Sequence, residues 1–116
     1  MADSLNLTHD AEYLLDSMYS VYLARRKNGV SADVAGRFGD CEDLQALCVP
    51  EWPVDDINTA ALSLCRKGLL SAGFGDNAVS ACRITDDGIA YMEQRFARNA
   101  DKLLHRLAEL RGILWP

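Results

Sequence analysis

The stretch "RKGLLSAGFGDNAVSACRITDDGIAYME", residues 66–93, decides the fold of this chain. Its letters indicate the end of a helix, two short strands and the start of another helix. The predicted strands are Leu69–Phe74 and Val79–Ile84, and the "GDNA" between them contains residues that tolerate the backbone angles of a tight turn. Gly68 is a typical helix stop, and Thr85 is a typical N-cap. The segment therefore predicts a β-hairpin between two helices.

Three helices are expected before the hairpin. The first, residues 8–27, has Thr8 as its N-cap and an apolar face at helical spacing. Tyr13 and Leu23 point away from that face, which indicates a second packing contact. A short helix over Ala32–Phe38 and a third over Val54–Lys67 follow.

The connection between the second and third helices, residues 40–53, is harder to interpret. Its letters "CEDLQALC" allow one or two helical turns, whereas "VPEWP" must be extended or turning because each proline restricts the residue before it. Trp52 lies between two prolines, and we expect it to fill the core under a loop rather than to bind a ligand.

The hairpin and the helix after it resemble those of the winged-helix superfamily. Thr85, Gly88 and Tyr91 match a T-x-x-G-x-x-Y/F pattern that follows the wing in many members. The resemblance implies a mainly α fold with a small β-hairpin. It also implies a winged-helix domain over residues 1–96, and we assign residues 97–116 to a C-terminal helix extension. No particular family is assigned, because the pattern is a general structural signature.

The resemblance implies that the third helix enters the major groove of DNA while the wing contacts phosphates. We therefore predict a DNA-binding protein, with transcriptional regulation as its expected role. The candidate DNA-binding residues are Asn58, Thr59, Ser63, Arg66, Lys67 and Arg83. Against this, Asp55 and Asp56 at the start of that helix would be repelled by phosphates. The alternative is a protein-interaction module on the same scaffold that does not bind DNA.

The last helix carries an apolar stripe from Ile89 to Leu114, with residues at spacings of three and four. No proline or glycine interrupts the stripe before Gly112. We therefore expect one continuous helix over residues 85–114, which is too long for one small domain to cover.

We expect the distal half of this helix to pair with that of a second subunit, which makes the protein a homodimer. The candidate dimerisation residues are Ala100, Leu103, Leu107, Leu110 and Leu114. In the alternative, the helix breaks near residues 99–101 and the remainder folds back on the first helix near Tyr13 and Leu23.

Composition indicates an ordinary globular chain of 116 residues with a net charge of −5. No apolar run is long enough to span a membrane and no secretion signal is present, so a cytoplasmic location is expected. The four cysteines have no metal-site spacing, and both histidines lie far from them in the sequence. We expect reduced cysteines, no metal and no cofactor. No catalytic motif is present, so we do not expect an enzyme.

Overall fold

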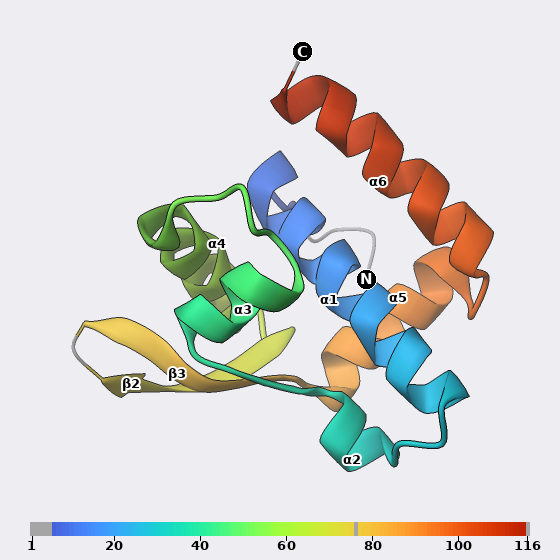
Figure 1. The fold of residues 1–116 in the computed structure, drawn as a ribbon, viewed down its shortest axis with the longest axis horizontal. Helices are drawn as coiled ribbons and strands as arrows, with labels where there is room; N and C mark the ends of the chain where they lie inside the picture. Colours follow the sequence, from blue (N-terminus) through green and yellow to red (C-terminus); the bar gives the residue numbers. More distant parts are fainter. Residues whose placement is uncertain (1–5, 76, 116) are drawn as a thin grey trace.

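The computed structural model describes residues 6–75 and 77–115, which form a group of helices with one three-stranded antiparallel sheet at its edge (Figure 1). This confirms the predicted mainly α fold with a small β-hairpin. Asp76, in the predicted turn, lies outside the described residues. The elements in chain order are α1 His9–Lys27, α2 Ala32–Ala35, β1 Arg37–Gly39, α3 Cys41–Leu47, α4 Val54–Arg66, β2 Leu70–Gly75, β3 Ala78–Ile84, α5 Asp86–Phe96 and α6 Ala100–Leu114.

Helix α1 is the central element of the fold. The Thr8 hydroxyl caps its start by accepting a hydrogen bond from the Ala11 amide at 3.1 Å. Every residue from 11 to 19 is buried, because α4, α5 and α6 all pack against this helix. A helix that is buried on all sides must be surrounded by other elements. The second packing contact expected at Tyr13 is therefore present.

The sheet has the strand order β1-β3-β2, with the predicted hairpin formed by β2 and β3. Strand β1 was not predicted: the expected helix over Ala32–Phe38 is wrong, since α2 ends at Ala35. Gly36 caps α2, and its carbonyl oxygen accepts a hydrogen bond from the Ile84 amide at 2.9 Å. Pairing with β3 and burial of Phe38 contribute more free energy than the few hydrogen bonds that a longer α2 would gain.

The connection between α3 and α4 covers one end of the core. Trp52 is buried there and its ring stacks on that of Tyr13, with 5.8 Å between the ring centroids. Its predicted role in the core is confirmed. The Trp115 ring meets the same Tyr13 ring edge-on at 5.4 Å, so the end of α6 joins this aromatic cluster.

The predicted continuous helix over residues 85–114 is wrong. Helix α5 ends at Phe96, the chain turns through residues 97–99, and α6 runs back along α1 (Figure 1). The Asn99 side chain caps α6 by accepting a hydrogen bond from the Lys102 amide at 3.1 Å. The Tyr19 hydroxyl donates to the Ala97 carbonyl oxygen at 2.6 Å and fixes the turn on α1.

The free energies involved explain why the helix breaks. Ala97 adopts a φ of 51° and a ψ of −133°, a region that strongly favours glycine, which costs about 1–3 kcal/mol. The fold-back buries Leu103 and Leu110, which contributes about 2 kcal/mol for each side chain. Burial of the stripe within one chain therefore exceeds the cost of the strained turn.

Gly88→Ala is expected to destabilise the protein by about 1–3 kcal/mol, measured by urea denaturation. The added Cβ would lie 2.3 Å from the Leu69 carbonyl oxygen and 2.8 Å from Ile84 Cγ2. The backbone here cannot retreat easily, because the Thr85 hydroxyl ties the start of α5 to the Gly68 carbonyl oxygen at 2.6 Å.

The matched control is Gly112→Ala in α6, where an added Cβ would have nothing within 4 Å. That variant should gain about 0.5–1 kcal/mol, because alanine favours a helix over glycine. An unchanged or higher stability of Gly88→Ala would contradict the close approach of α5 to the hairpin.

Candidate functional site

Asn58 joins α4 to the hairpin instead of facing outward. Its side-chain oxygen accepts a hydrogen bond from the Val79 amide at 2.9 Å and a weaker one from the Cys41 thiol at 3.8 Å. Its side-chain nitrogen donates to the Asn77 carbonyl oxygen at 3.5 Å. These contacts occupy the amide that the sequence suggested for base recognition.

The remaining DNA-binding candidates fall into two groups. Thr59 and Ser63 lie on α4, and the Thr59 hydroxyl donates within the helix to the Asp55 carbonyl oxygen at 3.0 Å. Arg66 and Lys67 lie at the end of α4, and Arg83 is exposed on β3. In residues 6–75 and 77–115 these three cations make no ion pair.

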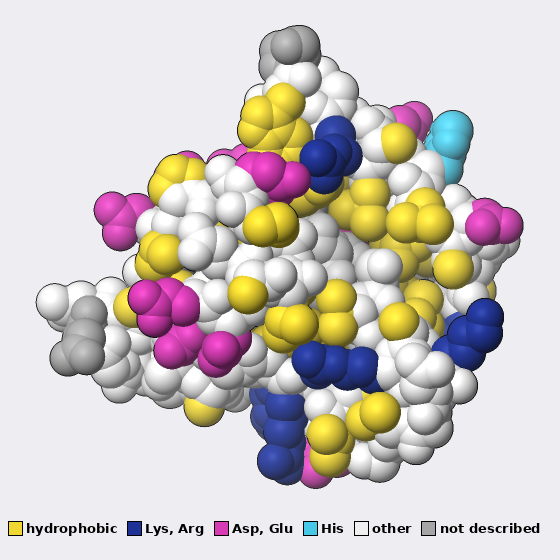
Figure 2. All heavy atoms as spheres, in the orientation of Figure 1, with side chains coloured by type: hydrophobic (Ala, Val, Ile, Leu, Met, Phe, Trp, Pro, Cys, Tyr) yellow, Lys and Arg dark blue, Asp and Glu magenta, His cyan; other side chains and the backbone are white. Residues whose placement is uncertain are grey.

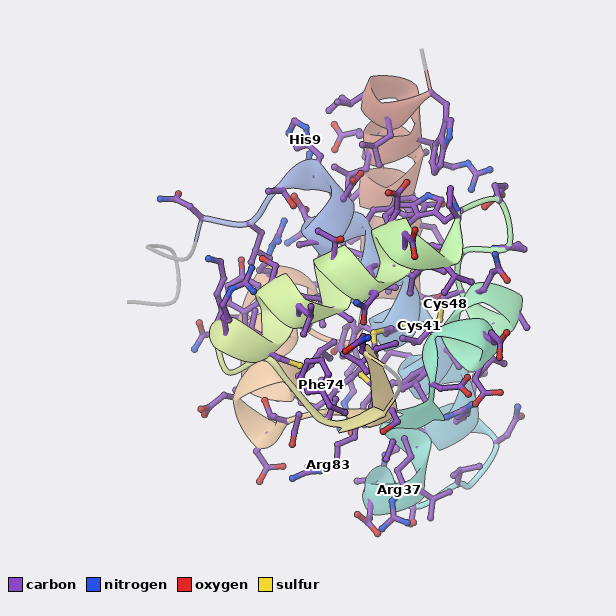
Figure 3. The ribbon with its side chains drawn as sticks, turned by 90° about the vertical axis from the view of Figure 1, so that its left-hand side faces the viewer. His9, Arg37, Cys41, Cys48, Phe74 and Arg83 are labelled. Carbon is purple, nitrogen blue, oxygen red and sulfur yellow. The ribbon has the colours of Figure 1, made fainter. Side chains whose placement is uncertain are left out.

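Arg83 lies opposite Arg37 in the register of β3 and β1. Both side chains point away from α4 on the same side of the sheet (Figure 3). Phe74, near the tip of the hairpin, is 64% exposed. Arg83 of the hairpin and Arg37 of β1 therefore face away from α4, and the structure does not bring the candidate residues onto one surface.

The exposed start of α4 is acidic, and so is the neighbouring α3. Asp55 and Asp56 occupy the first turn of α4, and Asp40, Glu42 and Asp43 lie at the start of α3. All five are exposed. Figure 2 shows acidic side chains gathered over α3, apart from the basic side chains over α2. We call these five residues the acidic face.

The candidate dimerisation residues are used largely within the chain. Leu103 and Leu110 are fully buried against the rest of the molecule, and Leu107 and Leu114 are half-buried. Only Ala100 is exposed. The homodimer stays a prediction, but the stripe that suggested it already has a partner in α1.

A buried ion cluster fixes α6 on α1. The Glu12 carboxylate on α1 accepts a hydrogen bond from Arg95 of α5 at 2.7 Å, and two from Arg106 of α6 at 2.7 and 2.8 Å. Its side chain is only 8% exposed. Although burial opposes ionisation, the hydrogen bonds from Arg106 and Arg95 hold the pKa of Glu12 below its ordinary value.

Asp16 lies one helical turn after Glu12 and is completely buried. Both of its carboxylate oxygens lack a hydrogen-bond partner in the described part of the chain. Burial, together with the negative charge of Glu12, raises the pKa of Asp16 to about 8. Asp16 is therefore a neutral acid at pH 7, next to an ionised one.

The four cysteines are free in the structure, with Cys41 and Cys82 buried and Cys48 and Cys65 half-buried. Burial raises the pKa of both Cys48 and Cys82 to about 12, so neither forms a reactive thiolate near neutral pH.

Within residues 6–75 and 77–115, no three His, Cys, Asp or Glu side chains are grouped so that they could hold a metal ion. None of the described helices combines the length and apolar character needed to cross a membrane.

The cluster around Glu12 and Asp16 was missed in the sequence because an acid in the first turn of a helix, such as Glu12, is usually explained by the helix dipole. Glu12 and Asp16 are four residues apart and therefore lie on one side of the helix, a spacing that is equally typical of a solvent-exposed face. The basic partners of Glu12, Arg95 and Arg106, lie 83 and 94 positions away in the sequence, so no local pattern connects them to it.

Asn58→Ala is expected to lower the free energy of unfolding by about 1–3 kcal/mol, because it leaves the Val79 amide of β3 without an acceptor. Hydrogen exchange of that amide should accelerate more than exchange in α1. Thr59→Ala is the matched control, since its exposed hydroxyl bonds only within α4, and it should change stability by less than about 0.5 kcal/mol. Equal effects of the two variants would refute the bridging role of Asn58.

A comparison of the chain with protein-family models, curated proteins and solved structures finds no match.

Proposed function

We propose that this protein is a non-catalytic interaction module on a winged-helix scaffold, which binds a basic partner through the acidic face. The scaffold part of the proposal is supported by the order of α1, β1, α3, α4 and the β2–β3 hairpin, and by the β1-β3-β2 sheet. The Thr85 cap and the close approach of Gly88 to the hairpin fit the same scaffold.

The choice of a basic partner rests on the side chains at the start of α4. In a DNA-reading winged helix these positions meet base edges and phosphates. Here the exposed first turn presents Asp55 and Asp56, while Asn58 is held by the hairpin. Carboxylates at these positions repel a phosphate backbone and attract lysine and arginine side chains.

Binding of a fluorescent oligolysine peptide, followed by anisotropy at low salt, tests the proposal. The double variant Asp55→Asn, Asp56→Asn should weaken binding about fivefold, because each exposed charge contributes about 0.5 kcal/mol. The control is Asp86→Asn, Asp87→Asn, which removes an equally exposed acidic pair from the first turn of α5. Equal weakening by both double variants would show attraction to net charge alone and refute the assignment to the acidic face.

DNA binding is the second candidate, and the specific observation in its favour is that Arg66, Lys67 and Arg83 have no acidic partner in the described residues. A gel shift with random duplex DNA at low salt separates the two functions. If this candidate holds, the duplex binds, and Arg83→Gln reduces the slope of log K against log salt by about 1. Absence of any shift at low salt would refute DNA binding and leave the interaction module.

A further inference from the structure

A cavity of about 480 Å³ lies between the C-terminal half of α1 and the turn that joins α5 to α6. Leu23 of α1 and Ala100 and Leu103 of α6 give it an apolar lining. Its volume lies in the range of cavities that enclose small organic molecules. Because both walls are needed to form it, the cavity exists only while α6 is folded back on α1.

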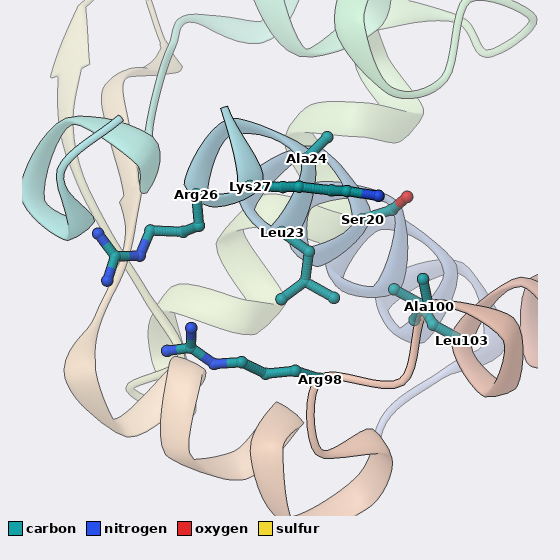
Figure 4. Close-up of a pocket in the computed structure, with 8 residues that line it drawn as sticks. All are labelled: Ser20, Leu23, Ala24, Arg26, Lys27, Arg98, Ala100 and Leu103. Carbon is teal, nitrogen blue, oxygen red and sulfur yellow. The ribbon is translucent and has the colours of Figure 1, made fainter. Parts of the chain in front are cut away.

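Three basic residues and no acidic residue line the same cavity. Figure 4 shows Arg26 and Arg98 extending toward one end, on either side of Leu23, while Lys27 extends toward Ser20. Three cations around one apolar cavity are unexpected in a chain whose net charge is −5.

The two arginines have unused hydrogen-bonding capacity. The Nε of Arg26 is buried without a partner in the described residues, although its Nη1 donates to the Val30 carbonyl oxygen at 3.1 Å. Arg98 pairs with Glu93 at 3.6 Å, well beyond the usual distance of a charge-assisted hydrogen bond, which is about 2.8 Å. Arg98 can therefore pair more closely with an added anion, and Arg26 contributes a second positive charge to the same lining.

We propose that this cavity binds a small amphipathic carboxylate, in which an unbranched hydrocarbon chain of medium length carries one carboxylate group. The hydrocarbon chain packs on Leu23 and Ala100. The carboxylate lies between Arg26 and Arg98, whose planar guanidinium groups match its two oxygens better than a lysine would. An uncharged chain would offer the two guanidinium groups no carboxylate, and a cationic chain would be repelled.

Binding should also strengthen the packing of α6 on α1, since the ligand contacts both helices. A ligand at 100 times its dissociation constant stabilises the folded state by about 2.7 kcal/mol, provided that it binds only that state. Occupancy of the cavity is thereby coupled to the position of α6. This inference is independent of the acidic face, which lies on α3 and α4.

Isothermal titration of the full chain with octanoate, below its micelle-forming concentration, tests the proposal. We expect one saturable site for octanoate, and we expect octan-1-ol and octylammonium to bind at least tenfold more weakly. Arg98→Gln should weaken octanoate binding at least tenfold. Its exposed side chain has Glu93 as its only ion-pair partner among the described residues, so the variant should fold. Methyl NMR signals of Leu23 and Leu103 should shift on titration with octanoate.

Lys102→Gln is the matched control, because Lys102 is an exposed cation of α6 that does not line the cavity. The affinity of this variant for octanoate should equal that of the unmodified chain. Equal binding of octan-1-ol and octanoate, or equal effects of Arg98→Gln and Lys102→Gln, would overturn the proposal. Absence of saturable octanoate binding would overturn it as well.

Discussion

Glu12→Gln is expected to lower the free energy of unfolding by about 3 kcal/mol at pH 7. The substitution keeps the shape of the side chain but removes the charge that Arg95 and Arg106 share. Removal of one member of a buried ion pair costs about 3–5 kcal/mol. The lower end applies here, because the two arginine side chains are 28% and 30% exposed. Urea denaturation measures the loss.

The loss should be concentrated at α6, because Glu12 is the hydrogen-bonding link between α1 and Arg106. Amide hydrogen exchange should accelerate in α6 more than in α4. The matched control is Asp33→Asn, which breaks the exposed pair of Asp33 and Arg37 and should cost less than about 0.5 kcal/mol. Comparable losses from the two variants would show that burial of Glu12 adds nothing to its ion pairs.

Asp16→Asn is expected to stabilise the protein increasingly as the pH rises from about 4 to about 8. The unfolded chain releases the Asp16 proton near its ordinary pKa of 3.8, whereas the folded protein keeps it up to a pKa of about 8. Between these values the unfolded state binds fewer protons, so higher pH lowers the stability of the unmodified chain. Asparagine cannot ionise, and the variant escapes this loss.

The magnitude follows from the free energy of proton release, which is about 1.4 kcal/mol for each pH unit. The stability difference between the variant and the unmodified chain should therefore grow by about 2–3 kcal/mol between pH 5 and pH 7. Urea denaturation at several pH values measures it, and taking the difference cancels any packing effect that is independent of pH. A constant difference over this range would refute the raised pKa of Asp16.

Glu12 acts in a different pH window and does not obscure this test. Because its folded-state pKa is lowered, its contribution is present above its ordinary pKa of 4.5 and is lost as the pH falls below that value. Asp16, in contrast, changes stability above pH 4. In Glu12→Gln, the pKa of Asp16 should fall, because the negative charge of Glu12 contributes to raising it. An NMR titration of the Asp16 carboxyl group would measure that fall.

Local sequence patterns predicted the elements whose signals lie within a few residues. The hairpin, the Thr85 cap and the first and third helices follow from turn residues, capping residues and helical spacing. Strand β1 did not follow, because three residues next to a glycine carry no signal of their own. Its partner is β3, more than forty positions later in the sequence.

The candidate site also contains features that the sequence predicts and features that depend on the tertiary structure. The acidic start of α4 could be identified from Asp55 and Asp56 alone. The loss of Asn58 as a base-reading residue could not, since it depends on where the Val79 amide lies. The cavity at Leu23 and Arg98 was also beyond prediction, because its two walls meet only after the chain has turned at Ala97.

The sequence by itself determined the hairpin, its capped flanking helices and the apolar stripe of the last helix, because each depends on short-range backbone preferences and side-chain spacing. Only the tertiary structure decided what the stripe packs against. The residues from 89 to 114 fit a continuous helix paired with a second chain as well as a broken helix folded on α1. The buried partners Glu12 and Tyr13 on α1, with Arg106 and Arg111 on α6, favour the fold-back. That outcome depends on contacts between residues more than ninety positions apart.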